Sequence, residues 1–146
     1  MLALDRLGLT PARYLSELQA LVVDLLRDYD IPAVTDEARP GVWARGRSPL
    51  HVGVSIRNGV SCFGVILNVD PDLEPFHDVI CDGSESPMTS MQRETPSRIR
   101  VASVRQRFVE LVAARFGFAR VSVFHNYDGA LPQPMRHATI AGTRSS

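Results

Sequence analysis

The chain has 146 residues, of which 45% are hydrophobic and 22% charged, the proportions of one ordinary globular domain. Acidic and basic residues number 16 each, so the net charge of zero gives no sign of a general affinity for nucleic acid or anionic membranes. All 16 basic residues are arginine, and the chain contains no lysine. We find no apolar run of membrane-spanning length, no signal-peptide pattern and too few cysteines for a disulfide framework, and therefore expect a cytoplasmic protein.

The first long element predicted is a helix. Thr10 followed by Pro11 is a typical helix start, because the hydroxyl caps a free backbone N–H and proline at the first helical position loses no hydrogen bond. Apolar residues then recur at helical spacing from Tyr14 to Leu26, which predicts a stripe packed on a sheet. Pro32 ends the helical region, and residues 33–36 are expected as a short edge strand.

A β-hairpin is predicted next. Asn58-Gly59 separates two runs rich in β-branched residues, at 52–57 and 60–69, and this dipeptide supplies the two positive φ angles of a type I′ turn. Gly53 and Gly64 interrupt the two runs. Glycine inside a strand marks either a bulge or the close approach of another backbone or a ligand, and the sequence leaves both open.

The remainder predicts a loop, a helix, a strand and a tail. Two prolines place residues 71–75 in a loop. Ser103 is expected to cap a helix that ends at Gly117. Its expected buried residues are Val104, Phe108, Leu111, Val112 and Phe116. Residues 118–124 alternate apolar and polar side chains, as a half-buried strand does, and residues 129–146 form a polar, disordered tail.

The hairpin region resembles the octanoyltransferase (lipoate–protein ligase B) family of the biotin/lipoate ligase superfamily. Residues 46–73 read GRSPLHVGVSIRNGVSCFGVILNVDPDL, against a family stretch of the type GRKIASIGVRVRRWVTYHGFALNVNPDL. Residues 2–9, the Pro40-Gly41-Val42-Trp43 strand and the last helix also resemble family segments. The resemblance implies an α+β fold over residues 1–128, a mixed, mainly antiparallel sheet with helices packed on one face. Trp43 is expected in the core or in a pocket wall.

The resemblance also implies acyl transfer through a cysteine thioester, with a lysine that draws the proton from the thiol. Aligned without gaps, that lysine falls on Ser48 and the cysteine of the family's PCG tripeptide falls on Asp82, with Cys81 in the proline position. A one-residue deletion in the preceding loop would make Cys81 the nucleophile. Because the thiolate is the reactive form, Cys81 needs a basic neighbour, for which His77 is the candidate.

The family's acyl-pocket segments supply the substrate-binding candidates. They are His51, Val52 and Gly53 in the first strand, and Gly64, Val65 and Ile66 in the second. Cys62 is expected as a small buried hydrophobe. Thr89-Ser90 keeps a family pair, which either caps a short helix from Met91 or contacts the substrate carrier. We expect no metal site and no cofactor, because the histidines and cysteines show no ligand spacing.

The resemblance implies an octanoyltransferase-like protein of lipoate biosynthesis, with acyl carrier protein and a lipoyl-domain protein as partners. We expect impaired or absent activity for this chain alone, because the lysine, the aligned cysteine and the family's glycine-rich RGG…TYHGPGQ block are missing. Two alternatives stand beside this expectation: a non-catalytic module that binds the carrier or the lipoyl domain, and one half of a split transferase. Without that block the hairpin sheet should expose an edge, which favours a homodimer or hetero-complex.

Overall fold

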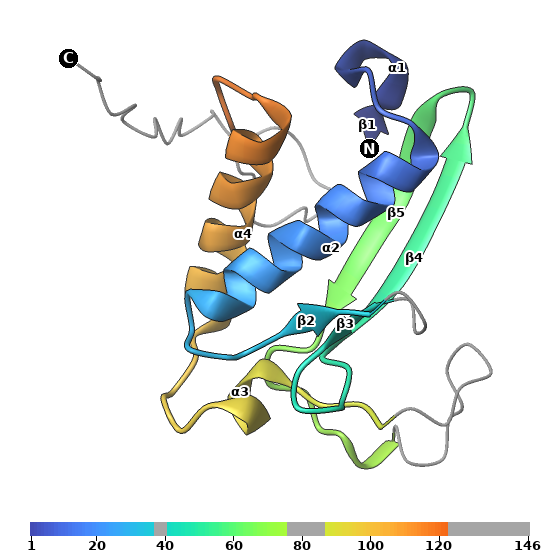
Figure 1. Ribbon diagram of the computed structural model, residues 1–146. Coiled ribbons are helices and arrows are strands. Elements are labelled where there is room, and N and C mark those ends of the chain that lie inside the picture. Colours follow the sequence, from blue (N-terminus) through green and yellow to red (C-terminus); the bar gives the residue numbers. More distant parts are fainter. Residues whose placement is uncertain (37–40, 76–86, 123–146) are drawn as a thin grey trace, which may run out of the picture.

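The computed structural model describes residues 1–36, 41–75 and 87–122 (Figure 1). The elements in chain order are β1 (Leu2–Ala3), α1 (Leu4–Leu7), α2 (Pro11–Arg27), β2 (Val34–Thr35), β3 (Val42–Trp43), β4 (Leu50–Arg57), β5 (Val60–Leu67), α3 (Met91–Glu94) and α4 (Val101–Phe116). The expected α+β class is confirmed. Both sheets pair in antiparallel fashion, and one parallel bridge joins Ser48 to Met88.

The β4–β5 hairpin is the centre of the larger sheet, and its turn is the predicted one. Asn58 and Gly59 have φ angles of 49° and 71°, as a type I′ turn requires. The strands pair without interruption from Leu50 opposite Leu67 to Arg57 opposite Val60. Gly53 lies directly opposite Gly64 within this ladder, so of the two alternatives left open a bulge is excluded at both glycines.

A third strand, β1, lies beside the start of β5 and was not predicted. Leu2 pairs with Ser61 and Ala3 with Val60, and the Leu2 N–H also donates to Ser61 Oγ at 3.0 Å. Two residues are too few to show the alternation by which a strand is read from sequence. The expected short strand at 33–36 is confirmed as β2, which pairs with β3 in a separate two-stranded sheet.

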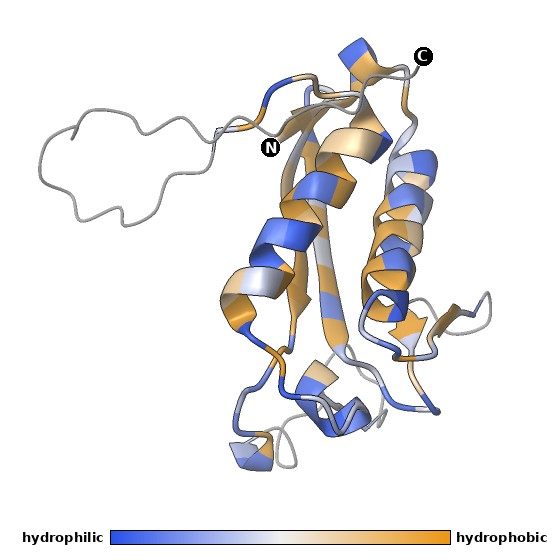
Figure 2. Ribbon diagram, turned by 90° about the vertical axis from the view of Figure 1, so that its left-hand side faces the viewer, coloured by the Kyte–Doolittle hydropathy of each residue, from blue (hydrophilic) through white to orange (hydrophobic). Residues whose placement is uncertain are grey.

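The helices cover one face of the larger sheet, as expected (Figure 1). Helix α2 begins at the predicted cap, where Thr10 Oγ1 accepts a hydrogen bond from the Arg13 N–H at 3.2 Å. Hydrophobic and hydrophilic residues alternate around α2 and α4, as in helices with one buried side (Figure 2). The two core clusters join these helices to one set of strand residues, namely Val52, Val54, Ile56, Val65 and Leu67.

Helix α4 starts earlier than predicted. It begins at Val101, and the Ser103 N–H already donates to the Arg100 carbonyl at 3.0 Å, so Ser103 is not its cap. The predicted end at Gly117, with a φ of 73°, is confirmed. Three of the expected core residues, Phe108, Leu111 and Val112, are only partly buried, while Ala113 is buried instead. Helix α4 packs against α2 at the side of the molecule, which leaves much of its surface exposed.

No strand forms in residues 118–122, so the prediction there was wrong for the part that the structure describes. The Phe118 N–H instead donates to the Ala113 carbonyl at 2.8 Å and closes the end of α4. Alternating side chains make a strand only where a neighbouring strand offers a ladder of hydrogen bonds. Residues 123–124 and the expected tail at 129–146 lie outside the described residues. Within the described residues, no helix is long and apolar enough to cross a membrane.

Candidate functional site

Ser48, the position aligned with the family lysine, lies where the chain enters β4. Its backbone N–H donates to the Pro87 carbonyl at 3.0 Å, and its carbonyl accepts from the Thr89 N–H at 2.9 Å. Its buried hydroxyl donates to the Leu50 carbonyl at 2.8 Å. Ser48 therefore fixes the segment that follows residue 86 against the start of β4, and its hydroxyl is held by the backbone.

Cys81, Asp82 and His77 lie outside the described residues. The structure describes both ends of the segment that contains them, up to residue 75 and from residue 87 onward. The chain re-enters the described structure beside Ser48 through Pro87 and Thr89. Ser48 and Thr89, which both belong to the predicted site and lie about 40 residues apart in sequence, are thereby joined by a backbone hydrogen bond.

The six expected substrate-binding residues form three consecutive cross-strand pairs, which fall on two faces of the sheet. They are His51 with Ile66, Val52 with Val65, and Gly53 with Gly64. Because side chains alternate between faces, the valine pair packs toward the helices while the other two pairs lie on the opposite face. The structure thus brings four of the six expected residues together on the face away from the helices, namely His51, Gly53, Gly64 and Ile66.

This second face of the hairpin exposes apolar groups. The exposed fraction of Ile66 on this face is 69%. Phe63, which lies opposite Val54 in the ladder and not in the Ile66 series, is 84% exposed. Phe63 has a φ of 63°, which is rare for a bulky residue and marks local strain beside Gly64. A methyl group added at Gly64 would meet no atom within 4 Å, so the backbone here is accessible. Cys62, expected to be buried, is only half-buried.

Thr89-Ser90 has a structural role in two parts. Ser90 caps α3, since its Oγ accepts from the Arg93 N–H at 3.3 Å, and this confirms the expected cap before Met91. The Thr89 hydroxyl donates to Glu94 Oε1 at 2.7 Å. Both side chains thus hold the segment next to Ser48 in place.

Glu94 is a buried carboxylate that sequence reasoning missed. Its side chain is 0% exposed and accepts from Arg47 Nη2 at 3.0 Å and from Arg45 Nη1 at 3.3 Å, besides Thr89. A buried charge is stable only when it is paired and hydrogen-bonded in this way. The arginines precede Glu94 by more than 45 residues, so no local pattern could have revealed the cluster.

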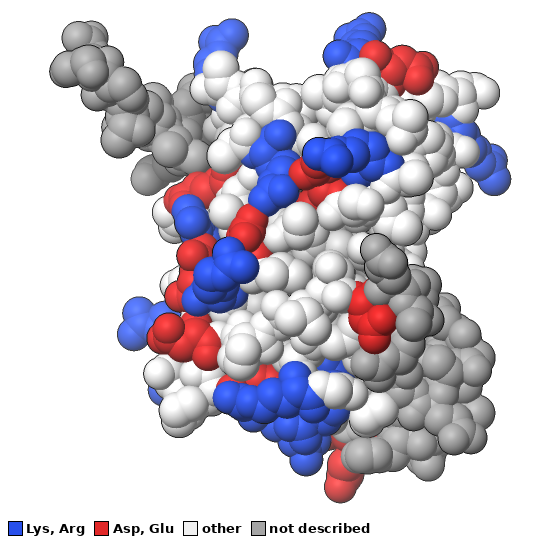
Figure 3. Space-filling model, in the orientation of Figure 1, with Lys and Arg blue, Asp and Glu red and all other residues white. Residues whose placement is uncertain are grey.

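Arginine side chains gather at the end of the molecule that the β3–β4 turn and α3 form. Arg45, Arg47 and Arg93 belong to the β3–β4 turn and to α3, where Figure 3 shows a continuous group of basic side chains. Arg93 is exposed, and the side chains of Arg45 and Arg47 are 55% and 41% exposed. We call these three residues the arginine surface.

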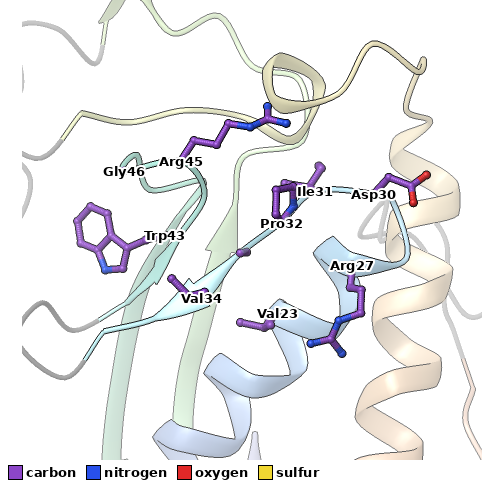
Figure 4. A pocket seen from close by; sticks show the side chains of 10 residues that line it. Val23, Arg27, Asp30, Ile31, Pro32, Val34, Trp43, Arg45 and Gly46 are labelled. Carbon is purple, nitrogen blue, oxygen red and sulfur yellow. The ribbon is translucent and has the colours of Figure 1, made fainter.

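A groove of about 690 Å³ lies on the other side of the β3–β4 turn, across β2 (Figure 4). Its lining residues are Val23, Arg27, Asp30, Ile31, Pro32, Ala33, Val34, Trp43, Arg45 and Gly46. Trp43 is 7% exposed and lines the groove, in agreement with its expected place in the core or a pocket wall. The two cations at the rim are engaged elsewhere, Arg27 with Asp24 and Arg45 with Glu94. The groove is separate from the Ser48 and Gly64 region.

Comparison with known proteins identifies the family to which this fold belongs. Residues 1–113 match the lipoyl protein ligase A/B catalytic domain, and the chain belongs to this family. It is 35% identical to the octanoyltransferase of Stutzerimonas stutzeri over 121 residues, which are 82% of this chain and 55% of that protein. It is 32% identical to the octanoyltransferase of Alcanivorax borkumensis over 118 residues, which are 80% of this chain and 48% of that protein.

The octanoyltransferase of Pseudarthrobacter chlorophenolicus is 35% identical over 104 residues, which are 66% of this chain and 47% of that protein. The resemblance seen in the sequence is thus confirmed at the level of the family. The chain spans about half the length of these relatives.

Proposed function

We propose that this chain takes part in protein lipoylation as an octanoyltransferase-like protein. It would move an octanoyl or lipoyl group from acyl carrier protein to a lysine of a lipoyl domain. The observation that carries the proposal is the backbone bridge between Ser48 and Thr89, which joins the lysine-aligned position to the end of the segment containing Cys81. We assign residues 1–128 to the catalytic domain and 129–146 to a tail.

In this proposal Cys81 is the acyl-carrying residue. Its thiolate attacks the carbonyl of the carrier thioester, the carrier thiol leaves, and the amine of the acceptor lysine then displaces Cys81 and forms an amide. Gly53, which is exposed, and Gly64, which is half-buried, would let the acyl chain lie against the backbone. The change of the aligned lysine to Ser48 removes the cationic proton acceptor, and the Asp82 carboxylate disfavours a neighbouring thiolate. We therefore expect slow transfer by this chain alone.

The test is incubation with octanoyl-acyl carrier protein, followed by mass spectrometry. Because the chain has no lysine, a stable amide can form only at its amino terminus, and any hydroxylamine-sensitive adduct lies on a thiol or hydroxyl. We expect an adduct on Cys81 that Cys81→Ser removes and Cys62→Ser, the matched control, retains. Ser48→Lys should increase its rate of formation. No adduct on Cys81, in the wild type or in Ser48→Lys, would refute a catalytic role.

A non-catalytic binding module is the second candidate function. It is favoured by the Ser48 hydroxyl, which is buried and hydrogen-bonded to backbone carbonyl oxygens, so it offers no proton acceptor to a thiol. This candidate predicts carrier binding without transfer. A split transferase differs from both, because transfer should appear when the half of a relative that this chain does not match is added as a separate polypeptide.

A further inference from the structure

The outer side of β5 offers backbone hydrogen-bonding groups that no described residue uses. Next to the turn, the Gly59 carbonyl accepts from the Leu4 N–H at 2.7 Å, and Ser61 pairs with β1 on the same side (Figure 1). Alternate residues of an antiparallel strand bond to the same side, and the pairing of β5 with β4 continues without a change of register. Val65 therefore also turns its N–H and its carbonyl away from β4, where no described strand lies.

This outer edge of β5 is uncharged. The strand reads VSCFGVIL, and the net charge of the whole chain is zero, so two copies can approach along β5 without repulsion between like charges. The other free edge of the sheet belongs to β4, which ends at Arg57. Phe63, with its φ of 63°, ends the regular part of β5 and leaves residues 64–67 extended. An edge without charge or proline is a template on which another strand can pair.

The side chains of residues 64–66 complement a second copy of themselves. An antiparallel pairing centred on Val65 places Val65 opposite Val65 of the second copy and Ile66 opposite Gly64. Ile66 is 69% exposed, and a methyl group added at Gly64 would meet no atom within 4 Å. A large side chain opposite a glycine covers the backbone that the glycine leaves bare. Because the pairing is two-fold symmetric, this contact forms twice.

We propose that β5 is a dimerisation strand, which pairs in antiparallel fashion with β5 of a second copy about Val65. The Val65 N–H of each copy donates to the Val65 carbonyl of the other, and the two three-stranded sheets join into one continuous sheet. The same surface is used by both copies, so the contact is closed by a two-fold axis and does not propagate through β5 into a longer assembly.

The dimer also changes the surroundings of the candidate acyl site, a consequence that rests on the proposed function. Gly53 lies opposite Gly64 in the ladder, and the acyl chain is proposed to lie along this pair. Ile66 of the second copy would border Gly64 on the same face and add an apolar wall to an open strip of backbone. Cross-linking without any acyl donor tests the dimer by itself, so a failure of acyl transfer leaves the dimer standing.

Disulfide cross-linking in a Cys62→Ser/Cys81→Ser background, which lacks both native cysteines, tests the register. A cysteine at position 64 of one copy and one at position 66 of the other lie directly opposite, with Cβ atoms about 4.5–5.5 Å apart, whereas like positions are diagonal and about 7–8 Å apart. Only the first spacing is close to that of a disulfide. Gly64→Cys mixed with Ile66→Cys, one of them carrying a size tag, should give at least about fivefold more cross-linked protein than either variant alone.

Val34→Cys is the matched control, at an exposed apolar residue of β2. Its mixture with Ile66→Cys should cross-link no more than either variant alone. Val65→Pro removes the outward N–H and spares the ladder with β4, since proline is tolerated where the N–H of an edge strand faces away from its neighbour. We expect this variant to be monomeric by light scattering, with the circular dichroism of the wild type.

Four outcomes would overturn the proposal. The two mixtures could cross-link equally, or Val65→Pro could fold and remain a dimer. The wild-type chain could be monomeric at micromolar concentration. A monomer that instead binds the half of a relative that this chain does not match would assign the edge to that other polypeptide. Cross-linking confined to the mixture of Gly64→Cys with Ile66→Cys supports the dimer even if Val65→Pro does not fold.

Discussion

At the scale of single residues, a buried carboxylate organises the region around the candidate site. Glu94 joins the β3–β4 turn, through Arg45 and Arg47, to the Thr89 hydroxyl. Loss of one arginine from such a cluster costs more than loss of an exposed ion pair, because the Glu94 carboxylate that remains has been removed from water. The cluster thus ties two distant segments together with a few strong contacts.

Replacement of Glu94 by glutamine should lower the free energy of unfolding by about 2 kcal/mol, since both arginines keep part of their hydration. Urea denaturation monitored by circular dichroism measures this loss. The matched control is Glu110→Gln, which removes a partly exposed pair with Arg107 on α4 and should cost less than about 1 kcal/mol. Equal losses in the two variants would show that burial adds nothing to the Glu94 cluster.

Substitution by alanine should destabilise the protein at one glycine of the hairpin and leave its stability unchanged at another. A methyl group at Gly59 would collide with the Asp5 carboxylate, and its φ of 71° is unfavourable for alanine. Gly59→Ala should therefore cost about 1–2 kcal/mol from the backbone alone. Gly64→Ala, with open space around it, should cost nothing measurable. Thermal unfolding compares the two.

The double variant Asp5→Ala/Gly59→Ala separates the collision from the backbone strain at Gly59. We expect it to recover only the part of the loss that comes from the carboxylate. A Gly59→Ala protein as stable as the wild type would contradict the type I′ turn.

At the scale of elements, ion pairs fasten α2 to α4. Glu17 on α2 accepts from Arg115 Nη1 on α4 at 2.9 Å and pairs with Arg13 at 2.6 Å. The hydrogen bond from Arg115 is the main reason why the pKa of the Glu17 carboxyl lies below its ordinary value of 4.5. A carboxyl group with a lowered pKa in the folded state stabilises the fold above its unfolded pKa, and this stabilisation is lost as the pH falls through the folded pKa.

Glu17→Gln should therefore lower the melting temperature at neutral pH, and the difference from the wild type should persist down to about pH 4.5 and close below it. Melting curves at about pH 7, 5 and 3 test this. Glu74→Gln, in an exposed loop, makes the same charge change away from Arg115 and should leave the melting temperature at neutral pH unchanged. If the difference in melting temperature between Glu17→Gln and the wild type grew as the pH fell, the Glu17 carboxylate would not be stabilising the fold.

At the scale of the whole molecule, the larger sheet has open edges. Strand β1 covers only Val60 and Ser61 of β5, and the outer side of residues 62–67 has no partner strand among the described residues. Strand β5 carries no charged residue, although free edges are usually protected by charges, proline or bulges. We therefore predict that the chain associates with itself or with another polypeptide.

Light scattering after size-exclusion chromatography at micromolar concentration tests this association. Ile66→Lys places a charge on the exposed side of β5 and should shift self-association toward the monomer. Val34→Lys, at an equally exposed apolar residue on the other sheet, should leave it unchanged. A wild-type protein that is purely monomeric and binds no partner would argue against an available edge.

Sequence alone determined the features whose causes are local. The Thr10-Pro11 cap, the Asn58-Gly59 turn, the Ser90 cap and the end of α4 at Gly117 each depend on one to four neighbouring residues, and the structure confirms them. The family was identifiable for a related reason, because its motif is an uninterrupted run of residues in the hairpin. The strand predicted at 118–124 does not form in residues 118–122, the part that the structure describes, because a strand also needs a distant partner.

Only the tertiary structure decided which distant residues meet. The β1–β5 pairing, the division of the six pocket residues between two faces, the Ser48–Thr89 bridge and the burial of Glu94 join segments that are far apart in the chain. A buried carboxylate and an exposed one are the same letter in a sequence. Burial and long-range hydrogen bonds distinguish them, and both arise only when the whole chain has packed.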